Sequence, residues 1–303
     1  MLIFYNLSSV ISFQPKQTIA IMHFSRRNFL RLSGIGLMAS QVPGAIAGGS
    51  HPEPKETGKK FPFELGIASY TFREFSLEET IGMTRRLGIG HIALKSMHMP
   101  LESSPDEIAQ AADLVRSAGI NLYGAGVIYM SSEEEVQRAF DYAKQAGLKI
   151  IIGVPEHDLL DLCNRKVQEY DIRLAIHNHG PGDQRYPSPE SAFTRISDLD
   201  PRMGLCMDIG HMVRIGLDPV VETSRFFDRV HDVHIKDVDQ AASSGTTVEM
   251  GRGVIDIPGF LKLLIKKKYT GVASFEFEKD GHDPLPGLAE SVGYVRGVLN
   301  CIG

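Results

Sequence analysis

The sequence predicts an α/β protein built as a single closed (β/α)8 barrel. About 243 of its 303 residues follow residue 60, close to the ~250 that one such barrel needs. Eight short, apolar, β-prone runs alternate with longer amphipathic segments, which implies parallel strands joined by right-handed crossovers. An open, doubly wound sheet is disfavoured because Ser69-Tyr70-Thr71-Phe72 follows the first strand, where a glycine-rich phosphate-binding turn would be expected.

Each of the sixteen expected elements has its own local signal. The strands are expected at residues 65–69, 91–95, 121–126, 149–154, 173–178, 204–208, 230–236 and 271–278. The helices are expected at residues 76–87, 105–118, 132–146, 157–170, 189–196, 219–227, 258–268 and 286–299. Ser76 followed by Glu79 predicts a capping box. Gly88, Gly119 and Gly147 stand where helices end, and proline stands near five helix starts.

A separate pattern precedes the expected barrel. The twin arginines of Ser25-Arg26-Arg27-Asn28-Phe29-Leu30 are followed by an apolar stretch that ends in Ala45-Ile46-Ala47, a small-residue cleavage pattern. These parts, in this order, predict a twin-arginine export signal and a periplasmic location. The apolar stretch is too short for a stable membrane span.

The expected boundaries follow from this pattern. The export signal occupies residues 1–47, a polar linker residues 48–60, and the barrel residues 61–303. Met22 lies just before the signal, so residues 1–21 are open to being an upstream misassigned start.

The composition argues against a nucleic-acid partner and against sites built from cysteine pairs. The formal charge is −5 and the pI about 6.1, whereas a protein that grips nucleic acid is normally basic, so no nucleic-acid partner is expected. The three cysteines form no CxxC pair, which disfavours a disulfide framework or a thiolate zinc site. Cys206 lies in an apolar run and is expected in the core.

Side chains that can bind a metal gather at the ends of expected strands five to eight. In a (β/α)8 barrel the catalytic residues lie at these carboxyl ends. Alternate residues of a strand share a face, so one donor from each strand can converge near the barrel axis. The expected ligands are His177, Asp208, His234 and Glu276. Two nitrogen and two oxygen donors suit one divalent ion of Mn2+, Zn2+, Co2+ or Fe2+.

Ordinary structural roles are the alternative for each of these side chains. A single histidine in an apolar strand is more often a hydrogen-bonded core residue than a ligand, and an aspartate at a strand end often caps a helix. Four consecutive strand ends that carry such groups favour the metal site, because burying unpaired polar or charged groups is costly.

Four motifs carry a resemblance to a known family. They are Gly204-Leu-Cys-Met-Asp208-Ile-Gly-His211, Val233-His234-Ile-Lys236-Asp237-Val238, Gly251-Arg252-Gly253-Val-Ile-Asp256 and Ser274-Phe-Glu276-Phe-Glu278. Together they resemble the sugar-phosphate isomerase/epimerase proteins of the xylose-isomerase-like TIM barrel superfamily, which include ketose 3-epimerases and inosose dehydratases. The resemblance extends from about Phe61 to the C-terminus.

The resemblance implies a metal-ligand pattern of Glu, Asp, His and Glu. Asp208, His234 and Glu276 match the last three positions, and His177 is the nearest candidate for the first. Ketose 3-epimerases use two metal-bound glutamates as a symmetric acid/base pair, and His177 interrupts that symmetry. Glu276 remains a candidate base, and His177 is expected either as a neutral ligand or as a base near neutral pH.

Further site residues are expected around the mouth of the barrel. Lys95, at the end of the second strand, is a candidate catalytic acid or base, with a solvent-exposed rim lysine as the alternative. Substrate contacts are expected from His98, His179, His211, Arg214, Lys236 and Arg252. Ordinary surface charge is the alternative for the two arginines.

The expected function is that of a divalent-metal-dependent isomerase or epimerase. It would act on a non-phosphorylated sugar or keto-sugar by proton abstraction next to a carbonyl. The main alternative is a keto-sugar dehydratase or lyase, favoured by His177 and by export to a compartment poor in phosphorylated sugars. A DNA-repair-type endonuclease and a non-catalytic sugar-binding protein are weaker alternatives. Relatives of this kind often form dimers or tetramers, so a homo-oligomer stays open.

Overall fold

The computed structural model describes residues 60–303 of the chain. The expected export signal, the possible misassigned start and the linker up to residue 59 lie outside the described residues. Among the helices of the described part, none is long and apolar enough to cross a membrane.

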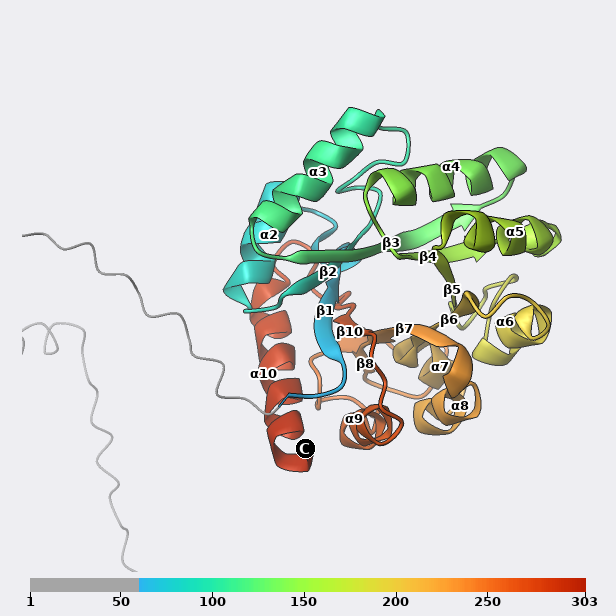
Figure 1. Ribbon diagram of the computed structural model, residues 1–303. Coiled ribbons are helices and arrows are strands. Elements are labelled where there is room, and N and C mark those ends of the chain that lie inside the picture. Colours follow the sequence, from blue (N-terminus) through green and yellow to red (C-terminus); the bar gives the residue numbers. More distant parts are fainter. Residues whose placement is uncertain (1–59) are drawn as a thin grey trace, which may run out of the picture. The chain divides into compact units, whose positions relative to one another are not determined.

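The predicted closed barrel is confirmed. Eight parallel strands pair in the order β1-β10-β7-β6-β5-β4-β3-β2, and β1 closes the ring by pairing with both β10 and β2 (Figure 1). The strands are β1 (Glu64–Ala68), β2 (His91–Leu94), β3 (Asn121–Met130), β4 (Ile150–Pro155), β5 (Arg173–His177), β6 (Met203–Asp208), β7 (Val230–Ile235) and β10 (Val272–Phe275).

Helices surround the barrel on its outside (Figure 1). Those that match the expected helices are α2 (Leu77–Arg86), α3 (Pro105–Ser117), α4 (Glu133–Gln145), α5 (Leu160–Tyr170), α6 (Pro189–Ile196), α8 (Pro219–Arg225), α9 (Ile257–Lys266) and α10 (Leu285–Ile302). The Ser76–Glu79 capping box is confirmed at the start of α2, and Ser104 with Glu107 forms a second one at α3. Short polar side chains therefore satisfy the free N–H groups at these two helix starts.

Several elements were not expected from the sequence. They are α7 (Ile209–Arg214), the 3-10 helices η1 (Ser69–Phe72) and η3 (Phe227–Arg229), and the antiparallel pair β8 (Asp237–Val238) and β9 (Thr247–Val248). The 3-10 helix η2 (His157–Leu159) forms the first turn of the helix expected at residues 157–170. The helix α7 and the β8–β9 pair follow strands whose ends carry expected ligands. They therefore shape the carboxyl end of the barrel.

Two strands differ in length from the prediction. β3 continues to Met130, beyond the expected end at residue 126, through a register shift against β4 after Ala125. β10 ends at Phe275, so Glu276 and Glu278 lie just beyond it. The backbone N–H of Glu276 still donates to the Ile235 carbonyl at 3.1 Å, which keeps this residue beside β7.

The hydrophobic core fills the layer between barrel and helices. Its largest fully buried side chains include Phe72, Phe140, Phe260 and Phe275. Cys206 is also fully buried, which confirms its expected place in the core. This packed layer fixes the strands, and with them the side chains at their carboxyl ends.

Candidate metal centre

The four expected metal ligands come together in the structure. His177 and Asp208 are the last residues of β5 and β6, His234 lies one residue before the end of β7, and Glu276 follows β10. One donor atom from each side chain lies within 4.8 Å of the other three, and all four residues are buried. Neighbouring parallel strands end at the same height, so the barrel itself assembles this cluster.

The spacing of the donor atoms suits a small divalent ion. His177 Nε2 lies 3.2 Å from His234 Nδ1 and 3.5 Å from Asp208 Oδ2. His234 Nδ1 lies 3.4 Å from Glu276 Oε2 and 4.0 Å from Asp208 Oδ2. Nitrogen and oxygen ligands about 2.0–2.2 Å from a tetrahedral ion stand roughly 3.3–3.6 Å apart. The donor set and its spacing therefore fit such an ion.

Buried polar atoms that make no hydrogen bond also indicate a metal site. Asp208 Oδ1 accepts a hydrogen bond from the His211 backbone N–H at 2.8 Å and caps α7. Among the described residues Asp208 Oδ2 makes no hydrogen bond, although it forms an ion pair with Lys236 at 3.0 Å. Asp208 can therefore serve both as a helix cap, through Oδ1, and as a metal ligand, through Oδ2. His177 Nδ1 is also buried without a hydrogen-bond partner among the described residues. His234 Nε2 makes no hydrogen bond either, but it lies 3.4 Å from Asp232 Oδ2.

Lys236 lies against the same carboxylates. Its Nζ is 3.0 Å from Asp208 Oδ2 and 2.6 Å from Glu276 Oε2, and it also contacts Glu278 Oε1. Burial raises the pKa of Glu276, but Lys236 and His234 lower it well below its ordinary value. Burial likewise raises the pKa of Asp208, and His211 and Lys236 lower it below the ordinary range. Both groups are therefore ionised and able to bind a cation.

Two other expected site residues lie near the mouth of the barrel. The half-buried Lys95 donates from Nζ to the Val127 carbonyl at 2.5 Å, and burial lowers its pKa against the opposing effect of Glu276. His179 lies with its ring 4.5 Å from that of His177, and burial lowers its pKa to about 4.

Tyr129 is a mouth residue that the sequence analysis missed. Its hydroxyl lies 3.1 Å from His179 Nε2, and its ring stacks on that imidazole at 5.7 Å. The ring is 47% exposed, with Lys95 5.7 Å from its centre. The expected end of β3 at residue 126 excluded Tyr129 from the strand end, so no sequence signal placed it at the mouth.

His211 and Arg214 lie on α7, directly beside the cluster. His211 Nε2 is 4.0 Å from Asp208 Oδ2, and burial lowers its pKa to about 3. Arg214 lies 3.4 Å from His211 Nδ1 and donates to the Ser243 carbonyl at 3.0 Å, and its buried Nε has no hydrogen-bond partner in the described part of the chain. A cavity of about 410 Å³ is lined by Arg214, Lys236 and Glu278, so it adjoins the cluster.

Two of the expected substrate contacts, His98 and Arg252, have partners away from the cluster. His98 is 5% exposed, and its ring nitrogens lie 2.9 Å from Ser69 Oγ and 3.0 Å from Thr80 Oγ1, so it joins η1 to α2 inside the core. Arg252 forms a two-bond salt bridge to Glu290 on α10, at 2.6 and 2.7 Å. Both side chains satisfy their polar groups within the protein, and neither is brought to the cluster.

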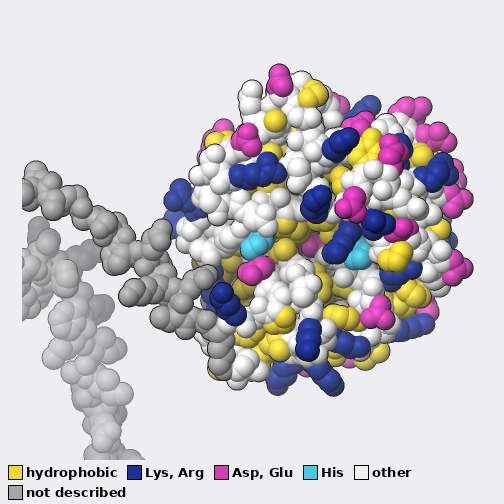
Figure 2. Space-filling view, viewed as in Figure 1, with side chains coloured by type: hydrophobic (Ala, Val, Ile, Leu, Met, Phe, Trp, Pro, Cys, Tyr) yellow, Lys and Arg dark blue, Asp and Glu magenta, His cyan; other side chains and the backbone are white. Residues whose placement is uncertain are grey.

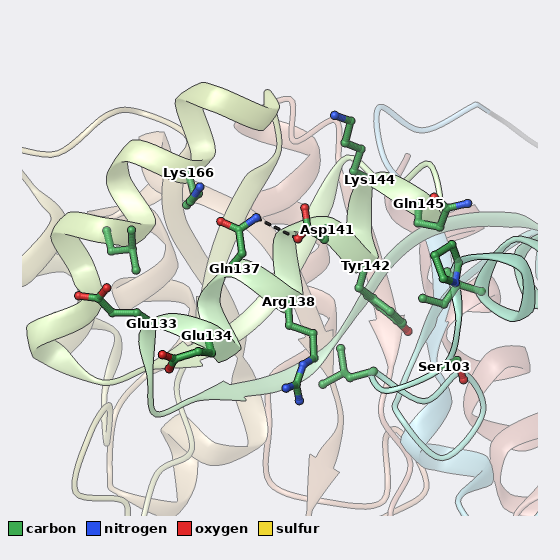
Figure 3. Close-up of a pocket in the computed structure, with 14 residues that line it drawn as sticks. Ser103, Glu133, Glu134, Gln137, Arg138, Asp141, Tyr142, Lys144, Gln145 and Lys166 are labelled. Atoms are coloured by element: carbon green, nitrogen blue, oxygen red, sulfur yellow. Dashed lines mark hydrogen bonds between the residues drawn. The ribbon is translucent and has the colours of Figure 1, made fainter.

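A second hollow has a lining different from that of the cavity beside the cluster. Figure 2 shows Lys and Arg side chains near the middle of the face seen in Figure 1, with histidines among them. A larger cavity of about 830 Å³ lies between α3, α4 and α5 on the outside of the barrel. Its lining includes Gln137 and Asp141, which are hydrogen-bonded at 2.9 Å (Figure 3). This groove contains none of the four metal donors.

Comparison with known proteins agrees with this architecture. An inosose dehydratase from Lacticaseibacillus casei is 23% identical over 272 residues, which cover 78% of this chain and 89% of the relative. The IOLI protein, solved with a bound zinc atom, is 16% identical with a TM-score of 0.66 and covers 80% of this chain and 99% of its own. An L-ribulose 3-epimerase is also 16% identical, with a TM-score of 0.65 and coverage of 79% and 95%.

The match to a protein family covers a longer part of the chain than the four motifs do. Residues 74–298, most of the described barrel, match the family described as xylose isomerase-like TIM barrel. The chain belongs to the xylose isomerase-like TIM barrel family.

Proposed function

We propose that this protein is a divalent-metal-dependent enzyme that acts on a non-phosphorylated sugar or keto-sugar by removing a proton next to a carbonyl group. The observation that carries the proposal is the buried cluster of His177, Asp208, His234 and Glu276, with donor atoms at ligand spacing. The similarity to an inosose dehydratase and to an L-ribulose 3-epimerase supports it, since both names denote enzymes that modify sugars or cyclic polyols.

The four clustered side chains would hold the ion, which when bound supplies Lewis-acid polarisation of a substrate oxygen. Mn2+, Zn2+, Co2+ and Fe2+ all suit the donor set. Lys236 supplies a fixed positive charge beside Glu276, where negative charge develops on the substrate when the proton leaves. Glu276 is the proposed base, because it is the carboxylate of the cluster that lies beside both His234 and Lys236.

Lys95 is the proposed second acid/base group. Burial lowers its pKa towards the range in which a lysine can both accept and donate a proton. Its ammonium forms no ion pair with a carboxylate among the described residues, so its charge is available to the substrate. His177, at the position where the resemblance implies a glutamate, carries no negative charge when it is a neutral ligand.

Two outcomes of proton removal remain as candidate reactions. Return of the proton to the same or the neighbouring carbon gives an epimerase or isomerase, the first candidate. Loss of a β-oxygen gives a dehydratase, which the replacement of a paired glutamate by His177 favours. The similarity to an inosose dehydratase over 78% of this chain also supports the second candidate.

We also propose that the protein works after export to the periplasm. The twin arginines, the apolar stretch and the small-residue cleavage pattern support this location. The location in turn favours a non-phosphorylated substrate. The formal charge of −5 supports a small-molecule substrate rather than nucleic acid.

Exchange in D2O tests the reaction. The purified protein, loaded with Mn2+, Co2+ or Zn2+, is incubated in D2O with free keto-sugars and with 3-keto-glycosides. Deuterium uptake without elimination supports an isomerase or epimerase, whereas an enone product supports a dehydratase. Glu276→Ala should abolish either reaction, and Glu290→Ala, which removes an acid remote from the cluster, should not. Absence of both exchange and elimination from all substrates contradicts the proposal.

A further inference from the structure

We infer that Asp232 is a positioning residue that orients the imidazole of His234 so that Nδ1 offers its lone pair to the metal. This inference rests on the metal site of the proposed function. It assigns a role to a buried carboxylate that makes no contact with the substrate face of the cluster.

The strand β7 places the two residues on one face. Asp232 and His234 are alternate residues of β7, and Lys236 continues the alternation just past the end of the strand, so the three side chains point to the same side. Asp232 is 0% exposed and His234 is 1% exposed. Lys236 lies at the mouth with the carboxylates, so Asp232 lies one layer deeper than His234 in the barrel interior.

The two nitrogens of His234 face different partners. Nδ1 lies 3.2 Å from His177 Nε2 and 3.4 Å from Glu276 Oε2, within the donor cluster. Nε2 lies 3.4 Å from Asp232 Oδ2, on the other side of the ring. A neutral imidazole carries one N–H and one lone pair, so a metal on Nδ1 requires the proton to stay on Nε2.

Carboxylates compete for that proton from both sides of the ring. Glu276 on the Nδ1 side would accept an N–H from Nδ1 and so occupy the position that the metal needs. Asp232 on the Nε2 side favours the opposite arrangement, with Nε2–H directed towards its carboxylate. A carboxylate that receives the second N–H of a metal-bound histidine fixes its tautomer and ring orientation.

Asp232 has few polar partners in its buried position. The Cys206 thiol donates to the same Oδ2 at 3.3 Å, and Asp232 Oδ1 has no hydrogen-bond partner among the described residues. A buried carboxylate with so few partners is costly to the fold, and an apolar side chain would fill this layer of the barrel more cheaply. The cost indicates a function, and His234 is the functional side chain within reach.

Zinc affinity of metal-free protein tests the inference, with Kd measured by competition with a chromophoric chelator. Asp232→Leu removes the acceptor and should weaken Zn2+ binding by about 10–100-fold. Asp232→Asn keeps an acceptor oxygen without the charge and should recover part of the loss. Cys206→Ala is the matched control, since it removes the other contact to Oδ2 but leaves the His234–Asp232 pair, and should keep near-normal affinity.

An NMR measurement distinguishes an effect of Asp232 on the orientation of the His234 ring from an effect on core packing. In zinc-loaded wild-type protein with 15N-labelled histidine, the Nε2–H of His234 should give a downfield proton resonance protected from exchange. It should move upfield and exchange faster in Asp232→Leu, and stay in place in Cys206→Ala. His234→Gln assigns the resonance by its disappearance.

Two results would overturn the inference. One is an unchanged zinc Kd and resonance in Asp232→Asn and Asp232→Leu; if the leucine variant does not fold, the asparagine variant alone decides. The other is an equal loss of affinity in Cys206→Ala, which would assign the effect to packing or to the Cys206 sulfur, which lies within 4.8 Å of donor atoms of His177 and His234, and not to orientation by Asp232. Both measurements need no substrate, so an inactive protein with the expected zinc and resonance changes would reject the proposed function and keep this inference.

Discussion

At the scale of single residues, His177 sets the charge of the metal cluster. The carboxylates of Asp208, Glu276 and Glu278 contact the Lys236 ammonium, which would share with a divalent ion the task of offsetting their negative charge. A glutamate at position 177, as the resemblance implies for many relatives, would add a fourth negative charge 3–4 Å from Asp208. The histidine thus makes the set softer and less anionic.

His177→Glu should therefore change which metal the protein prefers. The added carboxylate favours Mn2+ relative to Zn2+, and we expect the ratio of their dissociation constants to shift towards Mn2+ by at least about tenfold, or ~1.4 kcal/mol. Competition titrations of the metal-free protein measure this ratio. His177→Gln, which adds no charge, should weaken both ions without this shift. An unchanged ratio in His177→Glu would remove His177 from the ligand set.

His231 should contribute to acid sensitivity of the fold. Burial lowers its pKa to about 4, against an opposing hydrogen bond to the Pro201 carbonyl. An unfolded histidine titrates near about 6.5. Between these values the unfolded chain binds more protons, so the free energy of unfolding falls as pH drops from about 6.5 to about 4. His231→Gln should reduce this slope in urea titrations at several pH values, while the exposed control His282→Gln should not.

At the scale of elements, local capping signals set several helix starts. Ser104 accepts from the Glu107 N–H at 3.4 Å while Glu107 accepts from the Ser104 N–H at 2.8 Å, and Pro105 occupies the first turn. These bonds lie on the outside of the barrel, away from the cluster.

Ser104→Ala should therefore lower stability without affecting metal binding. Loss of the cap costs about 1 kcal/mol in the free energy of unfolding, measured in urea, and the zinc Kd should stay unchanged. The neighbouring control Ser103→Ala removes a hydroxyl that caps no helix. Equal stability of the Ser103 and Ser104 variants would show that the cap contributes nothing.

The same signals explain what the sequence can predict about elements. Caps, glycine stops and apolar periodicity identified eight strands and eight helices, because each depends on residues close together in the chain. The helix α7 was missed because it begins directly at the end of β6, with Asp208 as both the last strand residue and the N-cap. The length of β3 depends on its register against β4, which no local pattern records.

At the scale of the whole molecule, closure of the barrel makes the site predictable in part. Side chains alternate along a strand, and the strands of a barrel end at a common height. These two rules predict from the sequence that four side chains cluster: His177, Asp208, His234 and Glu276. His98 and Arg252 lie in segments after a strand, where alternation no longer holds, and their partners Thr80 and Glu290 come from distant helices. Such long-range pairing decides a side chain's role and cannot be read from spacing.

Export should depend on the twin arginines of the whole chain. Replacing Arg26 and Arg27 by lysine keeps the charge but removes the pattern of the twin-arginine route, so we expect the protein to be lost from the periplasm and retained in the cytoplasm. Immunoblots of fractionated cells that express the full chain measure this. The matched control replaces another arginine pair by lysine, Arg85 and Arg86 on α2 of the barrel domain. Equal periplasmic amounts in both variants would contradict the proposed route.

The location of a bound ion tests the central claim most directly. Crystals of the zinc- or cobalt-loaded protein, measured at the absorption edge of the metal, should give an anomalous peak about 2.0–2.2 Å from His177 Nε2, Asp208 Oδ2, His234 Nδ1 and Glu276 Oε2. A peak held by other residues, or no peak at saturating metal concentration, would contradict the proposed metal centre.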